Sequence, residues 1–179
     1  MRVARFYSPG DIRLEDAPEP WPAPDEVKIR VRNCSTCGTD VKIFNHGHQN
    51  LTPPRVIGHE IAGEVVEAGS DVDGWVAGDR VQVIAAVPCG VCYECKRGRM
   101  TVCPNQTSVG YQYDGGFAEF LAVPAAVLRV DGLNRIPDGV NPFHTCRRKS
   151  DNRFVTLSFS ESFPKTNVTD AGNTASPGW

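Results

Sequence analysis

The sequence predicts a mostly β fold in which short strands curl into a barrel. Segments that alternate apolar and polar residues, or that are rich in β-branched residues, recur along the first 140 residues. Turn-forming glycines and prolines separate them, and only one short segment has a helical pattern. The strand-like segments are RVARFY, DIRLED, EVKIRVR, IAGEVVEAG, DRVQVIA, FAEFLAV and VLRV, with turns at Ser8-Pro9-Gly10, Asp73-Gly74, Gly78-Asp79 and Gly115-Gly116.

The connection before the third strand should be an extended loop. Its sequence, APEPWPAPDE, has a proline at every second position from 18 to 24, and proline cannot donate a hydrogen bond to a sheet. The helical turn should begin near CGTDVKIFN, where Thr39 or Asp40 can cap free backbone N–H groups. Its apolar residues are too few for a long helix.

Composition favours one globular domain and excludes several partners. The chain has 179 residues, 40% of them apolar, with a mean hydropathy of -0.30. A net charge of -2 and a pI near 6.1 do not favour nucleic acid or an anionic membrane. The N-terminus lacks the apolar core of a secretory signal, and the longest apolar run, VQVIAAVP, is too short to span a bilayer. We therefore expect a cytoplasmic protein.

The last part of the chain differs from the rest. Ser, Thr and Asn supply 14 of the 39 residues from 141 to 179, and the rhythm of strands and glycine turns stops after Val140. We therefore divide the chain into a domain at 1–140 and an unrelated tail at 141–179, expected to be mostly disordered. The alternative is that FVTLSFSESF, which alternates well enough for a strand, docks along an open sheet edge.

Four cysteines lie close together in PCGVCYECKRGRMTVCPN. The gaps of two residues in this stretch allow a tight turn to present neighbouring sulfurs to one ion, and the last cysteine returns as a fourth thiolate. Buried free thiols in a core strand are the alternative, but the intervening YECKRGR is polar. We expect a structural zinc lobe at about 88–104, closed to substrate because all four ligands are cysteines: Cys89, Cys92, Cys95 and Cys103.

A second group of candidate ligands lies in CSTCGTD and PRVIGHEIAGEVVE. Cys37-Gly38-Thr39-Asp40, Gly58-His59-Glu60, the cysteine lobe and GGFAEF occur in the same order as in the zinc-dependent medium-chain dehydrogenases, which include alcohol, sorbitol and threonine dehydrogenases. The chain resembles this family over about residues 1–140. The resemblance implies a GroES-like β-barrel, which is the catalytic domain of these enzymes.

The resemblance also implies ligands for a catalytic zinc. Cys37 and His59 match the thiolate and imidazole of that ion, and Glu60 matches a direct or alternating ligand. Adjacent side chains of an ideal strand point to opposite faces, so Gly58 would have to permit a bend that brings both His59 and Glu60 to the ion. Taken alone, His59 and Glu60 could equally be a surface pair at the start of a strand.

Two further residues match catalytic positions of the family. Thr39 resembles the hydroxyl that passes the proton of the alcohol toward solvent, although it could also be a helix cap. His46 lies where the polyol branch often carries a histidine, or is an exposed loop residue. Cys34 and Cys37 have C-x-x-C spacing, but no thioredoxin-like pattern surrounds them, and Cys146 falls outside the register of the family's ligands.

The family transfers hydride to NAD(P) bound by a Rossmann domain, and the G-x-G-x-x-G fingerprint of that domain does not occur in this sequence. We therefore expect two zinc ions, one catalytic and one structural, in a truncated or frame-shifted catalytic segment of an alcohol or polyol dehydrogenase that is inactive alone. A small alcohol or polyol is the expected substrate, and a homo-oligomer is possible. The alternative is a stand-alone zinc-stapled β-barrel with a binding role and no redox chemistry.

Overall fold

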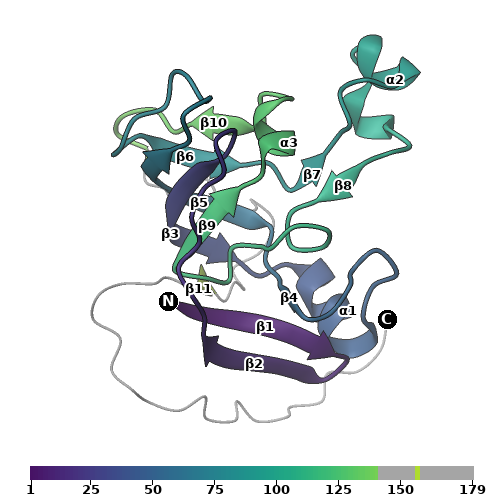
Figure 1. Cartoon of the computed structure of the whole chain (residues 1–179). Coiled ribbons are helices and arrows are strands. Elements are labelled where there is room, and N and C mark those ends of the chain that lie inside the picture. The colour runs from purple at the N-terminus through teal and green to yellow at the C-terminus, as the bar shows by residue number, and fades with distance from the viewer. Residues whose placement is uncertain (141–155, 158–179) are drawn as a thin grey trace.

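The computed structural model describes residues 1–140 and 156–157, and most of its regular structure is antiparallel strand (Figure 1). A three-stranded sheet has the order β2–β1–β4. It contains β1 (Arg2–Ser8), β2 (Asp11–Asp16) and β4 (Arg55–Val56).

A larger sheet has the order β10–β6–β5–β3–β11, and β9 also pairs with β3. Its strands are β3 (Val27–Ser35), β5 (Glu60–Ala68), β6 (Arg80–Val83), β9 (Phe120–Val123), β10 (Leu133–Arg135) and β11 (Thr156–Leu157). A short ladder joins β7 (Ala86–Val87) to β8 (Thr107–Ser108). The helical segments are α1 (Gly38–His46), α2 (Tyr93–Lys96), the 3-10 turn η1 (Met100–Val102) and α3 (Ala125–Leu128).

The core lies around β3, which pairs with β5, β9 and β11 in the larger sheet. Val27, Ile29 and Val31 are fully buried there, and their spacing of two residues places them on the one face of the strand that packs into the core. β3 pairs with β5 from Val27 opposite Ala68 to Ser35 opposite Glu60. The two loops that carry the candidate ligands of the second metal site therefore leave the same end of this ladder.

Most predicted strands form, but VLRV does not. The structure has helix α3 at Ala125–Leu128, followed by a turn in which Asp131 takes a φ of 53°. Pro124 precedes two alanines, which have the highest helix propensity, and the Val127 N–H donates to the Pro124 carbonyl. These local preferences outweigh the β-branched character of the segment. Residues 17–24 form no strand or helix, as their prolines predict.

Most of the predicted tail lies outside the described residues. Thr156 and Leu157 form β11, antiparallel to β3, with Thr156 opposite Ser35 and Leu157 opposite Cys34. This pair falls inside FVTLSFSESF and corresponds to the docked-strand alternative. Among the described residues, no helix is long and apolar enough to cross a membrane.

Candidate metal centres

The four-cysteine lobe projects from the barrel at the upper right of Figure 1, beyond β7 and β8. Its four sulfurs lie within 4.8 Å of one another, and the Sγ atoms of Cys92 and Cys103 are 3.8 Å apart. Two thiolates on a tetrahedral zinc, with bonds of about 2.3 Å, are separated by about 3.8 Å. A disulfide would need about 2.05 Å, and all four cysteines are free thiols. The sulfurs therefore fit a closed tetrahedral zinc site.

The chemistry of the thiols also fits a cation. Backbone N–H groups of Val91 and Cys92 lower the pKa of Cys89 to about 6, so this thiol ionises readily. Burial raises the pKa of Cys95 to about 12. One sulfur is thus prepared as a thiolate by the backbone, while the other needs a bound cation to lose its proton.

The second centre begins at the N-terminus of α1. Cys37 is the N-cap residue, and its Sγ accepts the Thr39 N–H at 3.3 Å. The Asp40 carboxylate closes the cap by accepting the Cys37 N–H at 2.8 Å. The prediction that Asp40 caps a backbone N–H group is confirmed, while Thr39 donates its own N–H to the sulfur of Cys37, the N-cap residue. The cap orients the sulfur while leaving it free to bind a further group.

His59 reaches Cys37 from the start of β5. Its Nε2 lies 3.2 Å from the Cys37 Sγ, within a few tenths of an ångström of the roughly 3.6 Å expected for a thiolate and an imidazole on one zinc ion. Gly58 supplies the predicted bend with a φ of +92°. A Cβ on Gly58 would lie 2.6 Å from the Phe117 ring, so glycine is required there for space as well as for conformation.

Asp40 is the third member of this centre. Its side chain is 3% exposed, and its Oδ1 lies 3.6 Å from the His59 Nδ1. Both atoms are buried without a hydrogen-bond partner among the described residues. If a metal binds Nε2, Nδ1 must carry the proton and can donate it to this carboxylate after a small movement. The orphaned pair therefore fits an imidazole that has a metal on its other nitrogen.

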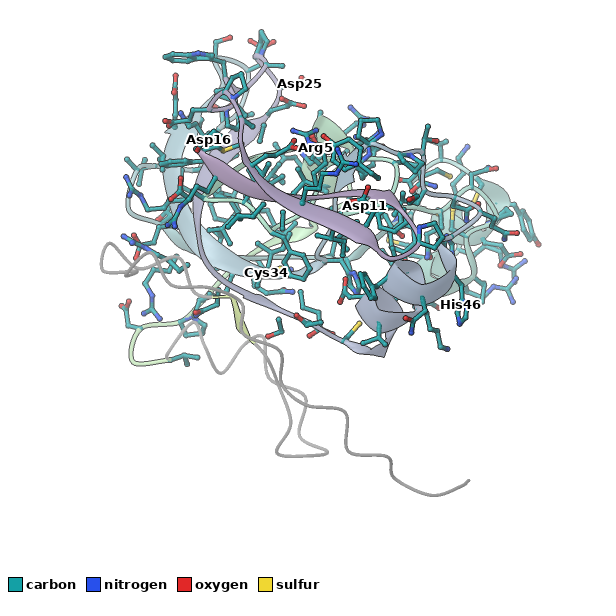
Figure 2. The ribbon with its side chains drawn as sticks, turned by 90° about the horizontal axis from the view of Figure 1, so that it is seen from below. Arg5, Asp11, Asp16, Asp25, Cys34 and His46 are labelled. Carbon is teal, nitrogen blue, oxygen red and sulfur yellow. The ribbon has the colours of Figure 1, made fainter. Side chains whose placement is uncertain are left out.

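The structure brings together only some of the predicted site residues. The side chains close enough together to hold a metal are Cys37, His59 and Asp40, and Glu60 is not among them. Thr39 lies in the first turn of α1, next to Cys37. His46 ends α1, about 13 Å along the helix axis from its start. In Figure 2, His46 lies on the outside at the end of the helix, away from Cys34.

Sequence reasoning noticed Asp40 only as a cap and did not assign it to the metal site. A usable signal was present, because a carboxylate three residues after a ligand cysteine lies on the same turn of the helix that the cysteine caps. Tyr111 was also missed. Its ring centroid lies 6.3 Å from that of His59, and nothing in GYQYDGG marks the tyrosine as a neighbour of the histidine.

A β-barrel that carries a closed four-cysteine lobe and a separate thiol–imidazole centre is typical of zinc-binding dehydrogenase domains. The family model of the alcohol dehydrogenase GroES-like domain matches residues 23–131, more than half of the chain. The chain belongs to this family. The predicted GroES-like fold is confirmed.

Relatives extend the comparison. L-threonine 3-dehydrogenase of Shewanella woodyi is 44% identical over 133 residues, which are 73% of this chain and 38% of that protein. A zinc-binding dehydrogenase of Sinorhizobium meliloti bound to NADP superposes with a TM-score of 0.72 at 36% identity, covering 81% of this chain and 41% of the other. Galactitol-1-phosphate dehydrogenase of Escherichia coli gives a TM-score of 0.72 at 26% identity, covering 82% and 41%. The chain thus spans about two fifths of the length of these relatives.

Proposed function

We propose that the chain is the zinc-binding catalytic segment of a dehydrogenase that oxidises a small alcohol or polyol with NAD(P). The observation that carries the proposal is the convergence of the Cys37 sulfur and the His59 Nε2 at 3.2 Å, apart from the closed cysteine lobe. A catalytic zinc needs protein ligands that leave one position open, and a structural zinc does not. The lobe offers four cysteine ligands, whereas the second centre offers a smaller group of side chains.

Each residue has a distinct role in the proposed reaction. Cys37 and His59 would hold the ion, and Asp40 would keep the proton of His59 on Nδ1. Glu60, which lies outside this group in the structure, is proposed as a direct or alternating ligand. A zinc ion held by these residues would supply Lewis-acid chemistry, which would lower the pKa of the alcohol hydroxyl. Thr39, beside Cys37, passes the released proton toward solvent. His46 is left out of this scheme because α1 carries it to the far end of the helix.

The nicotinamide cofactor lies outside this chain in the proposal. One relative in the comparison was solved with NADP, and the chain covers 41% of it. The printed sequence contains no G-x-G-x-x-G, so the chain by itself is expected to bind neither NAD nor NADP. We also propose that the protein is cytoplasmic, because the reducing conditions there keep cysteine thiols free to bind metal.

We also propose that the chain forms a homo-oligomer. It is supported by the exposed apolar side chains of the cysteine lobe, where Val91 and Tyr93 are 72% and 65% exposed.

Metal analysis of the purified chain tests the proposal. We expect two zinc ions per chain, and one ion with an unchanged circular dichroism spectrum after Cys37→Ser. Cys34→Ala is the matched control, because Cys34 lies close in sequence but belongs to neither ligand group; this variant should keep both ions. If Cys37→Ser keeps two ions, or if Cys37→Ser and Cys103→Ser lose the same single ion, the two-centre reading is wrong.

A further inference from the structure

The loop from β8 to β9 is fixed against the backbone that carries His59. The N–H groups of Gly115 and Gly116 donate to the carbonyls of Val56 and Gly58 at 2.7 and 2.9 Å. A Cβ on Gly115 would lie 2.2 Å from the Gly58 carbonyl oxygen, so only glycine allows this approach. The loop is therefore held at one position relative to the second metal centre.

This loop places Tyr111 beside the centre. The residue is 9% exposed. Its ring meets the His48 ring edge-on, with centroids 4.6 Å apart and an angle of 85°, and it lies tilted at 49° to the His59 ring. Edge-to-face contacts of this kind hold an aromatic ring in one orientation. Tyr111 therefore forms a fixed wall next to the ligand histidine.

The hydroxyl of Tyr111 is not among the buried unpartnered atoms of the described residues, so it is open to solvent or to a bound molecule. The backbone N–H of Tyr111 donates to the Ser108 carbonyl, which leaves the side-chain hydroxyl to find another partner. The Tyr111 ring lies beside that of His59, which belongs to the group of side chains that could hold a metal. An accessible tyrosine O–H can donate a hydrogen bond to a bound molecule. A phenylalanine would supply the same packing without this unused donor.

We propose that the Tyr111 hydroxyl donates a hydrogen bond to the oxygen of the ligand that occupies the open position of the Cys37–His59 centre. The inference rests on the proposed function and deepens it by naming a residue that selects the bound molecule. A ligand with an acceptor oxygen gains this hydrogen bond. A nitrogen ligand that uses its lone pair on the metal gains nothing from it. Tyr111 is thus a specificity residue for alcohols, separate from the metal ligands.

The test uses the whole chain with cobalt(II) in the second centre and follows its visible absorption. The spectrum of the Cys37→Ser variant, which retains the lobe ion, is subtracted to isolate that centre. The probes are 2,2,2-trifluoroethanol, an oxygen ligand, and imidazole, a nitrogen ligand. Tyr111→Phe should weaken trifluoroethanol binding about threefold to tenfold, which corresponds to one hydrogen bond. Imidazole binding should change less than about twofold.

Tyr113→Phe is the matched control. It makes the same chemical change two residues further along the loop, but Tyr113 lines a cavity of about 660 Å³ that includes neither Cys37 nor His59. Its affinity for both probes should equal that of the unmodified chain. Unchanged trifluoroethanol affinity in Tyr111→Phe overturns the inference, as does an equal loss for both probes, which would mean that the ring acts only by packing. A chain in which neither probe gives a signal that depends on Cys37 refutes the proposed function itself.

Discussion

Asp40 connects the helix cap to the metal centre through its two carboxylate oxygens. Oδ2 accepts the Cys37 N–H, and Oδ1 faces the His59 Nδ1. One buried side chain therefore sets both the direction of the thiol and the tautomer of the imidazole. Residues with two such tasks tolerate few substitutions, even when they do not bind the metal.

Replacing Asp40 with Asn should weaken zinc binding at the second centre about 10- to 100-fold, because the amide cannot form a charge-assisted hydrogen bond with the His59 imidazole. Competition with a coloured chelator measures this affinity. The lobe ion provides an internal reference and should be unaffected. Asp138→Asn, in an exposed turn, is the matched control. Equal zinc affinity in Asp40→Asn and the unmodified chain would show that Asp40 acts only as a cap.

The same residue shows how far sequence reasoning reaches at this scale. Cys37 and His59 could be predicted because thiolate and imidazole are typical zinc ligands and the surrounding motifs are specific. The part played by Asp40 depends on a contact between residues 19 positions apart, which the cap pattern alone does not reveal. The place of Glu60 outside the group likewise depends on the direction in which the bend at Gly58 turns the strand.

At the scale of elements, the ladder between β3 and β5 positions the second centre. Ser35 and Glu60 are paired at its end, so Cys37 and His59 lie just beyond that end, one in each segment. The bend at Gly58 then turns the imidazole toward the sulfur. The ligand geometry therefore depends on the backbone of one residue between β4 and β5.

Gly58→Ala tests this dependence. We expect a loss of about 3 to 5 kcal/mol in the free energy of unfolding, from the positive φ and from the overlap of the new Cβ with the Phe117 ring. Gly74→Ala separates the two effects, because Gly74 has a φ of +81° with nothing within 4 Å of an added Cβ. Gly74→Ala should lose only about 1 to 2 kcal/mol in the free energy of unfolding. Urea unfolding in excess zinc gives both values, and equal losses would remove the steric part of the explanation.

The strands themselves could be predicted from alternation and turn residues, with one instructive failure. VLRV has β-branched residues at both ends, yet its backbone follows the helical preference of the preceding Pro-Ala-Ala. A segment of four residues carries too little periodicity to outweigh its neighbours. Longer segments, such as β3 and β5 with nine residues each, were unambiguous.

At the scale of the whole molecule, the barrel and the lobe are stabilised in different ways. The main apolar core includes Val87 and Val109 but no residue between them. Within the lobe, Val91, Tyr93 and Val102 are all more than 60% exposed. The lobe therefore has little apolar core of its own, and a bound ion must supply most of its order.

Removing zinc with a chelator should consequently unfold the lobe while the barrel persists. Hydrogen exchange should accelerate over residues 88–106, because these amides depend on the ion, and should remain slow in β3 and β5. Structural zinc contributes about 10 to 16 kcal/mol of apparent binding energy in small peptides, so the local effect should be large. Uniform acceleration through β3 and β5 would show instead that the ion stabilises the barrel.

The sequence was most informative where constraints are local and least informative where they are not. Four closely spaced cysteines restrict one loop strongly, so the lobe could be placed within a few residues. The pairing of Thr156 with Ser35 joins segments more than one hundred residues apart, and Ser-rich alternation alone does not identify which edge accepts a strand. Only the structure shows that β3 is the strand with which this segment pairs.

The chain enters the lobe through β7 and leaves it through β8, where Ala86 lies opposite Ser108 and Val87 opposite Thr107. Its two stems are therefore hydrogen-bonded neighbours, and the distance to be bridged at the base is no greater than in an ordinary hairpin. This geometry makes the base a natural junction for protein engineering. A short turn can close it after excision of the lobe, and a foreign domain with adjacent termini can be grafted in its place without spreading the sheet beneath.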